Sequence, residues 1–109
     1  MRSRTQALVV LVTCANVAEA KRLAAQLVRA RLAACVNLVP KVESFFRWKG
    51  KLERTPETIL LIKTTKAAFE PLRRAVLRLH SYDTPEIIAV PIARGHPPYL
   101  AWVLASTEP

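Results

Sequence analysis

Hydrophobic residues dominate the first part of the chain. The run from Ala7 to Val12 consists almost entirely of valine and leucine, which is typical of a central strand covered on both faces. Asn16, followed three residues later by Glu19, predicts a helix start, and apolar residues at helical spacing continue the helix to about Arg31. We therefore expect a buried strand followed by an amphipathic helix.

Two long apolar segments occupy the middle of the chain. They run from Ala33 to Trp48 and from Leu52 to Thr65, and Lys49-Gly50-Lys51 forms a tight turn between them. Pro40 predicts a bulge or an exposed edge, and Pro56 marks an edge again. Each arm has about 15 residues, whereas a strand usually has about 5 to 6. Part of this hairpin should project beyond the domain's own sheet.

A second helix, a strand and a short helix follow the hairpin. Apolar residues recur every three or four positions at Phe69, Leu72, Val76 and Leu79. We place the start of this helix near Phe69, so that Pro71 falls in its first turn, and its end near His80. Ile87 to Ile92 is a fourth predicted strand, and Pro97-Pro98 begins the C-terminal helix.

This order of elements predicts the fold class. Strand, helix, two strands, helix and strand form an α+β, ferredoxin-like βαββαβ sandwich, with two helices on one face of an antiparallel sheet. The distinctive features are the extended hairpin of the second and third strands and the short C-terminal helix. We expect a single domain over residues 1–109, with residues 1–6 as a flexible N-terminus. Because this fold hosts many functions, function must come from sites.

The first twenty residues allow a second interpretation. A basic stretch from Met1 to Thr5 precedes the apolar run, and Ala18-Glu19-Ala20 is similar to the cleavage site of a secretory signal peptide. The apolar run is at the short end for such a peptide, so we favour a strand that enters a helix. No apolar run approaches the roughly 20 residues that span a bilayer, and we expect no membrane segment.

The charged residues of the chain are predominantly basic. The chain has 17 Lys and Arg against 8 Asp and Glu, which gives a formal net charge of +9. Such a balance favours polyanions as partners. Along the sequence, however, the basic residues form small separated groups, with no dense run and no interleaved aromatic residues. A solvated basic surface is therefore the preferred interpretation, and nucleic acid is not favoured as a partner.

Reactive residue types are present, but not in a catalytic pattern. Cys14 and Cys35 lie in apolar stretches, which favours buried thiols in a reducing cytoplasm over a disulfide. His80 lies at a predicted helix end and His96 in a turn, so structural roles are preferred to a general base. With only two glycines the chain has no glycine-rich phosphate loop. We expect no enzymatic activity.

Five blocks of the sequence, in order, resemble the CutA divalent-cation tolerance proteins, and the resemblance extends from about Ala7 to Ser106. The blocks are Leu32 to Pro40, Phe46 to Lys51, Leu61 to Thr65, His80 to Ile87 and Tyr99 to Trp102. The resemblance implies a homotrimer, similar to PII-type signalling proteins, in which the long hairpins pair edge to edge around a threefold axis. A closed ring would also cover an apolar strand edge that otherwise invites aggregation.

The resemblance also implies copper binding. The cysteine and two histidines described as ligands in the family fall on Val12, Leu79 and His80, so only His80 is retained. Cys14 lies two residues past Val12, on the same strand face, and could replace the missing cysteine if the strand extends that far. His80 and Cys14 are thus the candidate ligands for Cu(II) or another divalent cation. The alternative is a buried thiol and a helix-capping histidine.

A second group of residues matches motif positions of the family better. Cys35, Lys63, Tyr82 and Glu86 are implied to line a cleft between subunits. An ammonium, a phenol and a carboxylate brought together could bind a small polar or anionic ligand. The alternative is a lysine–carboxylate pair that fixes the register of the interface.

Three functions therefore remain open, in order of preference. The first is a homotrimeric, non-enzymatic divalent-cation (copper) tolerance protein with a PII-like role in small-ligand binding or signalling. The second is a structural trimer that docks a protein partner through its hairpin tips. The third is a basic nucleic-acid-binding module, which rests on charge alone.

Overall fold

The computed structural model describes residues 5–109, which form four strands and three helices. In chain order the elements are β1 (Ala7–Cys14), α1 (Val17–Arg29), β2 (Cys35–Trp48), β3 (Lys51–Thr65), α2 (Lys66–Leu79), β4 (Ile87–Pro91) and α3 (Pro97–Ser106). This is the predicted α+β order, and the ferredoxin-like arrangement is confirmed. Residues 1–4, within the segment expected to be flexible, lie outside the described residues.

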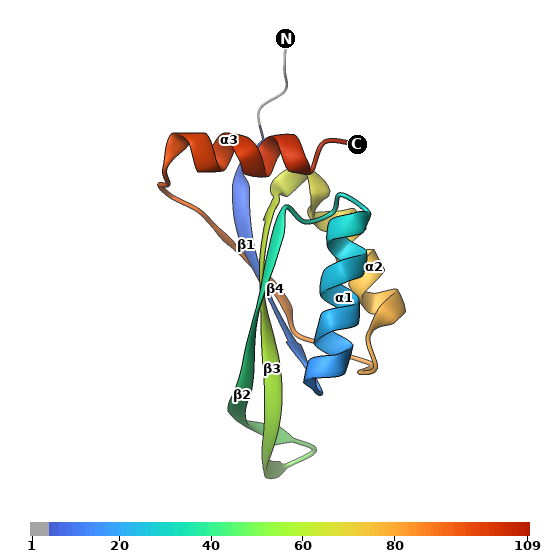
Figure 1. Cartoon of the computed structure of the whole chain (residues 1–109). Helices are drawn as coiled ribbons and strands as arrows, with labels where there is room; N and C mark the ends of the chain where they lie inside the picture. The colour runs from blue at the N-terminus through green and yellow to red at the C-terminus, as the bar shows by residue number, and fades with distance from the viewer. Residues whose placement is uncertain (1–4) are drawn as a thin grey trace.

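The four strands form one antiparallel sheet in the order β2-β3-β1-β4. Helices α1 and α2 cover one face, and α3 crosses the end of the sheet that lies away from the hairpin tip (Figure 1). Strand β1 pairs with β3 only from Thr58 to Thr65. The first half of β3 therefore has β2 as its only neighbour in the sheet. This half forms the projecting part of the hairpin, as its length predicts.

The hairpin turn and its bulge follow from local backbone chemistry. Lys49 and Gly50 have φ values of 51° and 80°, a pair of left-handed residues that defines the tight type I′ turn. The register between β2 and β3 shifts between Val39 and Val42, and Lys41 has a φ of 61°. The bulge predicted from Pro40 is therefore confirmed, because proline cannot donate to the ladder.

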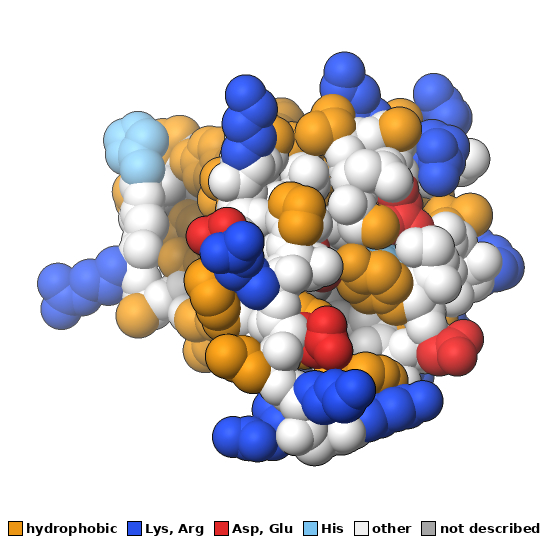
Figure 2. Space-filling view, turned by 90° about the horizontal axis from the view of Figure 1, so that it is seen from below, with side chains coloured by type: hydrophobic (Ala, Val, Ile, Leu, Met, Phe, Trp, Pro, Cys, Tyr) orange, Lys and Arg blue, Asp and Glu red, His pale blue; other side chains and the backbone are white. Residues whose placement is uncertain are grey.

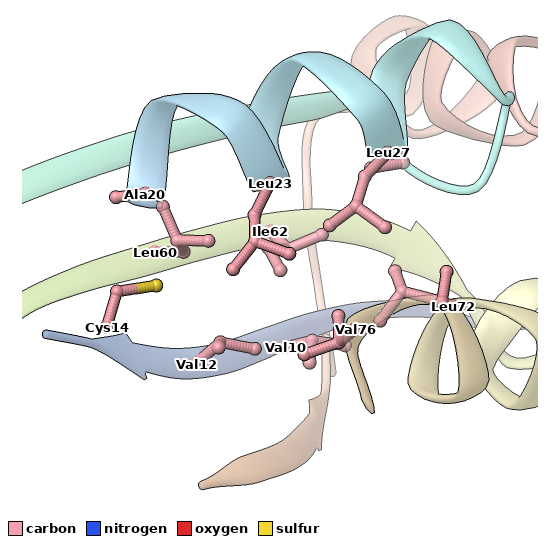
Figure 3. Packing of buried hydrophobic residues seen from close by; sticks show 12 residues of the cluster. Val10, Val12, Cys14, Ala20, Leu23, Leu27, Leu60, Ile62, Leu72 and Val76 are labelled. Atoms are coloured by element: carbon pink, nitrogen blue, oxygen red, sulfur yellow. The ribbon is translucent and has the colours of Figure 1, made fainter. Parts of the chain in front are cut away.

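The core lies between the helices and the sheet. Alternate residues of β1 and β3 point toward α1 and α2, and eight large side chains there have no more than 1% of their surface exposed (Figure 3). These are Val10, Val12, Leu23, Leu27, Leu60, Ile62, Leu72 and Val76. Each such side chain contributes about 1.5–3 kcal/mol by leaving water. This packing fixes the ends of the helices relative to the ends of the strands.

The predicted start of the second helix is wrong. Helix α2 begins at Lys66 rather than near Phe69, and Pro71 lies inside it. Pro71 has no N–H to donate to the carbonyl of Ala67, which would normally disfavour this position. Thr65 caps the helix by accepting from the Ala68 N–H. The two preceding N–H groups, of Lys66 and Ala67, donate to the Gln6 carbonyl and to Thr5 Oγ1, so the first turn is held before the proline is reached.

Two other boundaries differ from expectation. Strand β1 continues past Val12 to Cys14, which pairs with Thr58 of β3. Helix α1 ends at Arg29, because Arg31 has a φ of 61° and cannot continue it. No helix in the described part of the chain is long and apolar enough to cross a membrane.

Candidate metal centre

Cys14 is where β1 ends, under the first turn of α1 (Figure 3). Its side chain points to the same face as Val10 and Val12, and all three are fully buried. Glu19 from α1 and His80 from the end of α2 meet it there. The Cys14 sulfur, one carboxylate oxygen of Glu19 and one ring nitrogen of His80 all lie within 4.8 Å of one another. We call these three residues the Cys14 cluster.

Glu19 is held in place by backbone donors. Its own N–H donates to Asn16 Oδ1 at 2.8 Å, which is the predicted helix cap. Its carboxylate then accepts from Ala15 N at 3.0 Å and from Ser81 N at 2.8 Å. Burial opposes ionisation, but the hydrogen bonds from Ser81 and Ala15 outweigh it and lower the pKa of Glu19. The carboxylate is therefore negative although only 3% of the residue is exposed.

His80 is a buried residue with both ring nitrogens engaged. Its Nε2 lies 2.8 Å from the carbonyl oxygen of Thr13, and Tyr82 N donates to its Nδ1 at 3.0 Å. A carbonyl accepts only from a protonated nitrogen, so this pattern defines a neutral ring with the proton on Nε2. Nδ1 also lies 3.9 Å from Glu19 Oε2. The expectation that His80 caps α2 is too simple, because its ring links β1, α1 and the loop after α2.

Tyr82 adds a second carboxylate to the same region. Its hydroxyl donates to Glu57 Oε2 at 2.7 Å, and its ring packs on His80 with centroids 4.8 Å apart. Burial and the hydrogen bond to Glu57 raise the pKa of Tyr82. Glu57 and Glu19 are both buried, and neither forms an ion pair with Lys or Arg of residues 5–109. Buried carboxylates normally have such a partner.

The Cys14 thiol is protonated at neutral pH. Burial, followed by the negative charges of Glu19 and Glu57, raises the pKa of Cys14 to about 12. A bound cation would lower the pKa of the Cys14 thiol, because it stabilises the thiolate and balances the negative charges of the two carboxylates. The negative character of the site therefore favours a cation and disfavours an anion.

The donor set of the cluster fits a borderline metal ion. A thiolate, an imidazole and a carboxylate are ligands for ions such as Cu²⁺ or Zn²⁺. Binding would release the thiol proton of Cys14. It would also need Nδ1 of His80 to give up its hydrogen bond from Tyr82. These two costs would weaken binding without removing any of the three donors.

The other predicted site residues separate into two pairs within one chain. Cys35 and Lys63 face each other across β2 and β3, and Lys63 Nζ donates to Asn37 Oδ1. Tyr82 lies with the Cys14 cluster, close to the other end of the β1–β3 pairing. Glu86 is exposed just before β4. A single chain does not bring the four together, and a cleft between subunits stays a prediction.

Sequence reasoning identified Cys14 and His80 but missed the third member of the cluster, Glu19, and the neighbouring Glu57. Glu19 was interpreted only as part of the helix cap, although its position five residues after Cys14 placed it at the same end of β1. No local pattern distinguishes Glu57, which is buried one residue before the β1–β3 pairing begins and accepts from the Tyr82 hydroxyl. His96, expected in an exposed turn, is exposed and precedes α3 without a side-chain cap bond.

Comparison with known proteins gives a consistent result. Residues 8–106 match the family model of the CutA1 divalent ion tolerance protein. The chain is 45% identical over 97 residues to Protein CutA of Mus musculus, which covers 89% of this chain and 55% of the mouse protein. It is 46% identical over 99 residues to the divalent-cation tolerance protein CutA of Thermus thermophilus, which covers 91% of this chain and 96% of that protein.

The fold comparison agrees with the sequence comparison. The solved structure of the Thermus thermophilus divalent cation tolerance protein matches with a TM-score of 0.92 at 45% identity, over 94% of this chain and 99% of that one. The chain spans little more than half the length of the animal and plant relatives it matches. From the family match, the identities and the shared fold, the chain belongs to the CutA family of divalent-ion tolerance proteins.

Proposed function

We propose that this protein is a homotrimeric, non-enzymatic binding protein for a divalent cation, with copper as the first candidate and the Cys14 cluster as the cation site. One observation carries the proposal. Three side chains with metal-binding atoms, from β1, α1 and the end of α2, converge within 4.8 Å in a region of buried and uncompensated negative charge. The family membership, which names divalent cations, supports the same ligand class.

The trimer is supported by what a single chain leaves uncovered. Strand β2 forms one edge of the sheet over 14 residues. On the sheet face away from α1 and α2, Ile88 and Val90 of β4 each have 50% of their surface exposed. Long apolar edges and faces of this kind require a partner to avoid aggregation. A closed ring of three copies would cover both the β2 edge and the apolar face. We place this trimer in a reducing cytoplasm.

The same assembly would complete the second predicted site. Cys35 and Lys63 of one subunit would meet Tyr82 and Glu86 of the partner subunit, forming a cleft for a small polar or anionic ligand in a PII-like manner. Within one chain the Lys63 ammonium is already positioned by Asn37, which supports a role as a fixed cationic anchor in such a cleft.

The cation site is tested by copper titration in a calorimeter, with the absorption spectrum of the complex as a second readout. Wild-type protein should bind one Cu²⁺ per chain and show a thiolate-to-copper charge-transfer band. Cys14→Ser should lose the band. Cys14→Ser, Glu19→Gln and His80→Gln should each weaken binding at least about tenfold, because substitution of a residue that only orients a metal ligand already costs that much.

Cys35→Ser is the matched control, because it removes the only other thiol of the chain. It should retain both the affinity and the band. Unchanged binding in Cys14→Ser and His80→Gln would contradict the assignment, and so would an equal loss in Cys35→Ser. Light scattering tests the assembly separately, because the trimer should have three times the 12.2 kDa chain mass, and a monomer at micromolar concentration would contradict it.

A structural trimer that docks a protein partner is the second candidate. It is favoured by the hairpin tip, where Phe45, Trp48 and Leu52 have 61%, 54% and 77% of their surface exposed. Aromatic side chains of this kind dominate binding energy at protein interfaces. Light scattering of Trp48→Ala decides between tip-mediated assembly and tip-mediated docking, because a variant that remains trimeric leaves the tip free for another protein.

A further inference from the structure

The outer face of the two sheet-covering helices is strongly basic. On α1, on α2 and just beyond the end of α1 there are six exposed Lys and Arg residues that have no ion-pair partner among residues 5–109. They are Lys21, Arg22, Arg29, Arg31, Lys66 and Arg78. We call this surface the basic helix face. Figure 2, a view from the hairpin end, shows Lys and Arg side chains standing out around the margin of the molecule, with few acidic ones among them.

Helical geometry places these charges on one surface. Helix α1 buries Ala20, Leu23 and Leu27 against the sheet, so Arg22 and Arg29, seven residues and two turns apart, share its solvent side. On α2 the buried residues include Leu72 and Val76, which leaves Arg78 exposed on the outside. Because the apolar side of each helix faces the core, the basic residues of both helices lie on the solvent side.

The two helices combine their charges into one strip. They run in opposite directions side by side (Figure 1), so the end of α1 meets the start of α2. Residues of both ends, Arg31 and Ala67 among them, line one shallow pocket. Arg31 and Lys66 therefore belong to one end of the strip, and Lys21, Arg22 and Arg78 to the other. Each helix is about 20 Å long at 1.5 Å per residue.

Acidic compensation on this surface is small. Glu70 is the exposed acidic residue of α2, and it pairs with Arg73 at 3.0 Å and Arg74 at 4.0 Å. Glu19, the acidic residue of α1, is buried in the Cys14 cluster. The six remaining cations therefore face solvent with no acidic partner among the described residues.

We propose that the basic helix face binds the phosphodiester backbone of nucleic acid without sequence preference, an activity distinct from cation binding at the Cys14 cluster. Double-stranded DNA carries one charge per roughly 1.7 Å, so a strip about 20 Å long meets about a dozen phosphates. Four of the six cations are arginines, whose planar guanidinium pairs with phosphate oxygens in two-point contacts. The helices lie flat on the sheet, and within residues 5–109 no element projects from this face into a groove, which limits contacts to the backbone.

An anionic membrane is the competing polyanion, and the distribution of aromatic residues disfavours it. Helices that bind membrane surfaces insert Trp, Phe or Leu beside their basic residues. Here the exposed aromatic side chains belong to the hairpin and to α3, and Phe69, the aromatic residue of α2, packs against the core. The exposed apolar residues of the two helices are all aliphatic and still more than half buried, with 38–44% of their surface exposed: Val17, Val28, Leu77 and Leu79. The sheet face that the proposed trimer would cover is opposite to the basic helix face, so assembly would leave this face accessible.

The experiment measures binding of a fluorescein-labelled DNA duplex of about 20 base pairs by anisotropy, over roughly 50 to 300 mM KCl. Wild-type affinity should fall steeply with salt, with a slope of log K on log [KCl] of about −0.9 per phosphate neutralised. Arg22→Gln/Arg29→Gln/Arg78→Gln should reduce the size of that slope by about 2 to 3 and weaken binding at least about tenfold near 100 mM KCl.

A charge-matched variant supplies the control. Arg47→Gln/Lys51→Gln/Arg94→Gln removes three exposed cations from the hairpin and from the segment before α3, and it should keep the wild-type slope. Equal losses in both triple variants would overturn the proposal in favour of net charge alone. It would also be overturned by absent binding at 50 mM KCl, by a preference above about tenfold between two unrelated duplexes, or by binding to phosphatidylserine vesicles but not to DNA.

Two checks keep the result interpretable. Circular dichroism should give the same thermal midpoint for both triple variants as for wild type, and if the helix variant unfolds, Arg22→Gln alone should still reduce the slope by about 0.9. Cys14→Ser should bind DNA like wild type. Failure of copper binding and failure of DNA binding are therefore separate results.

Discussion

The two faces of the sheet differ more than any other two regions of this molecule. On the face covered by α1 and α2, Val10, Val12, Leu60 and Ile62 have no exposed surface. On the other face their immediate neighbours, such as Leu11 and Leu61, are only half-buried, and β4 is largely exposed. Both faces are apolar, although a half-exposed sheet usually alternates apolar and polar residues.

The difference shows which part of the molecule the chain completes by itself. The helices, the helix caps and the close-packed core that cover one face all belong to this chain of 109 residues. The other face is also largely apolar, but among residues 5–109 only α3 covers it, and only at one end. A second copy of the chain, as in the proposed trimer, would cover such a face.

A pair of neighbouring leucines gives the largest expected effect. Leu60→Ala removes a side chain with no exposed surface and should lower the free energy of unfolding by about 2–5 kcal/mol. Leu61→Ala, one residue further on the opposite face, should cost about half as much or less in dilute protein, because part of that surface is already in water. Urea unfolding of both variants measures the difference.

Protein concentration sharpens the same comparison. If identical subunits cover the second face, the cost of Leu61→Ala should grow as the protein concentration rises, because assembly stabilises the folded state by mass action. Leu60→Ala should keep the same cost at every concentration. Equal costs for both variants at all concentrations would contradict the distinction between the two faces.

The two cysteines repeat this contrast on a smaller scale, because Cys14 is buried and Cys35 is only half-buried. Cys14 has an ordinary pKa of 9.0 that rises to about 12 in the folded protein. A raised folded-state pKa gives stability that is present below pH 9 and lost as pH rises toward the folded value. Without metal, the free energy of unfolding should fall by about 1.4 kcal/mol between pH 8 and pH 10 from this thiol.

Substitution assigns that loss to one residue. Cys14→Ser should remove the whole of this thiol's contribution, about 1.4 kcal/mol of the decrease between pH 8 and pH 10. Chelator is present throughout, so that bound metal does not hold the thiolate. If the free energy of unfolding depends on pH in the same way in wild type and in Cys14→Ser, then folding does not raise the pKa of the Cys14 thiol.

The features that the sequence predicts are those that depend on short stretches. The strand of Val10 and Val12, the Asn16 cap and the Gly50 turn each follow from a few neighbouring residues. Pro71 was misplaced because its local rule competes with contacts made by Thr5 and Gln6, about sixty residues away in sequence. Long-range pairing decided that helix boundary.

The candidate site divides in the same way. Cys14 and His80 could be proposed from the family resemblance, whereas Glu57 joins them only through its place in the sheet and the long-range hydrogen bond from Tyr82. The basic helix face is a similar case, because its charges are scattered along the chain and are brought together by the antiparallel packing of α1 and α2. Register and packing are properties of the whole fold, and no local pattern contains them.

The smallest expected effect lies in the hairpin turn, furthest from the core. Lys49 adopts a φ of 51°, a left-handed conformation in which asparagine is more stable than lysine. Lys49→Asn should therefore raise the free energy of unfolding by about 0.5 kcal/mol, provided that the projecting hairpin unfolds together with the body. Gly50→Ala, at a φ of 80°, is the opposite control and should lower it by about 1 kcal/mol. No change in either variant would mean that the tip unfolds separately, and the cooperative unit would then consist of the helix-covered sheet alone.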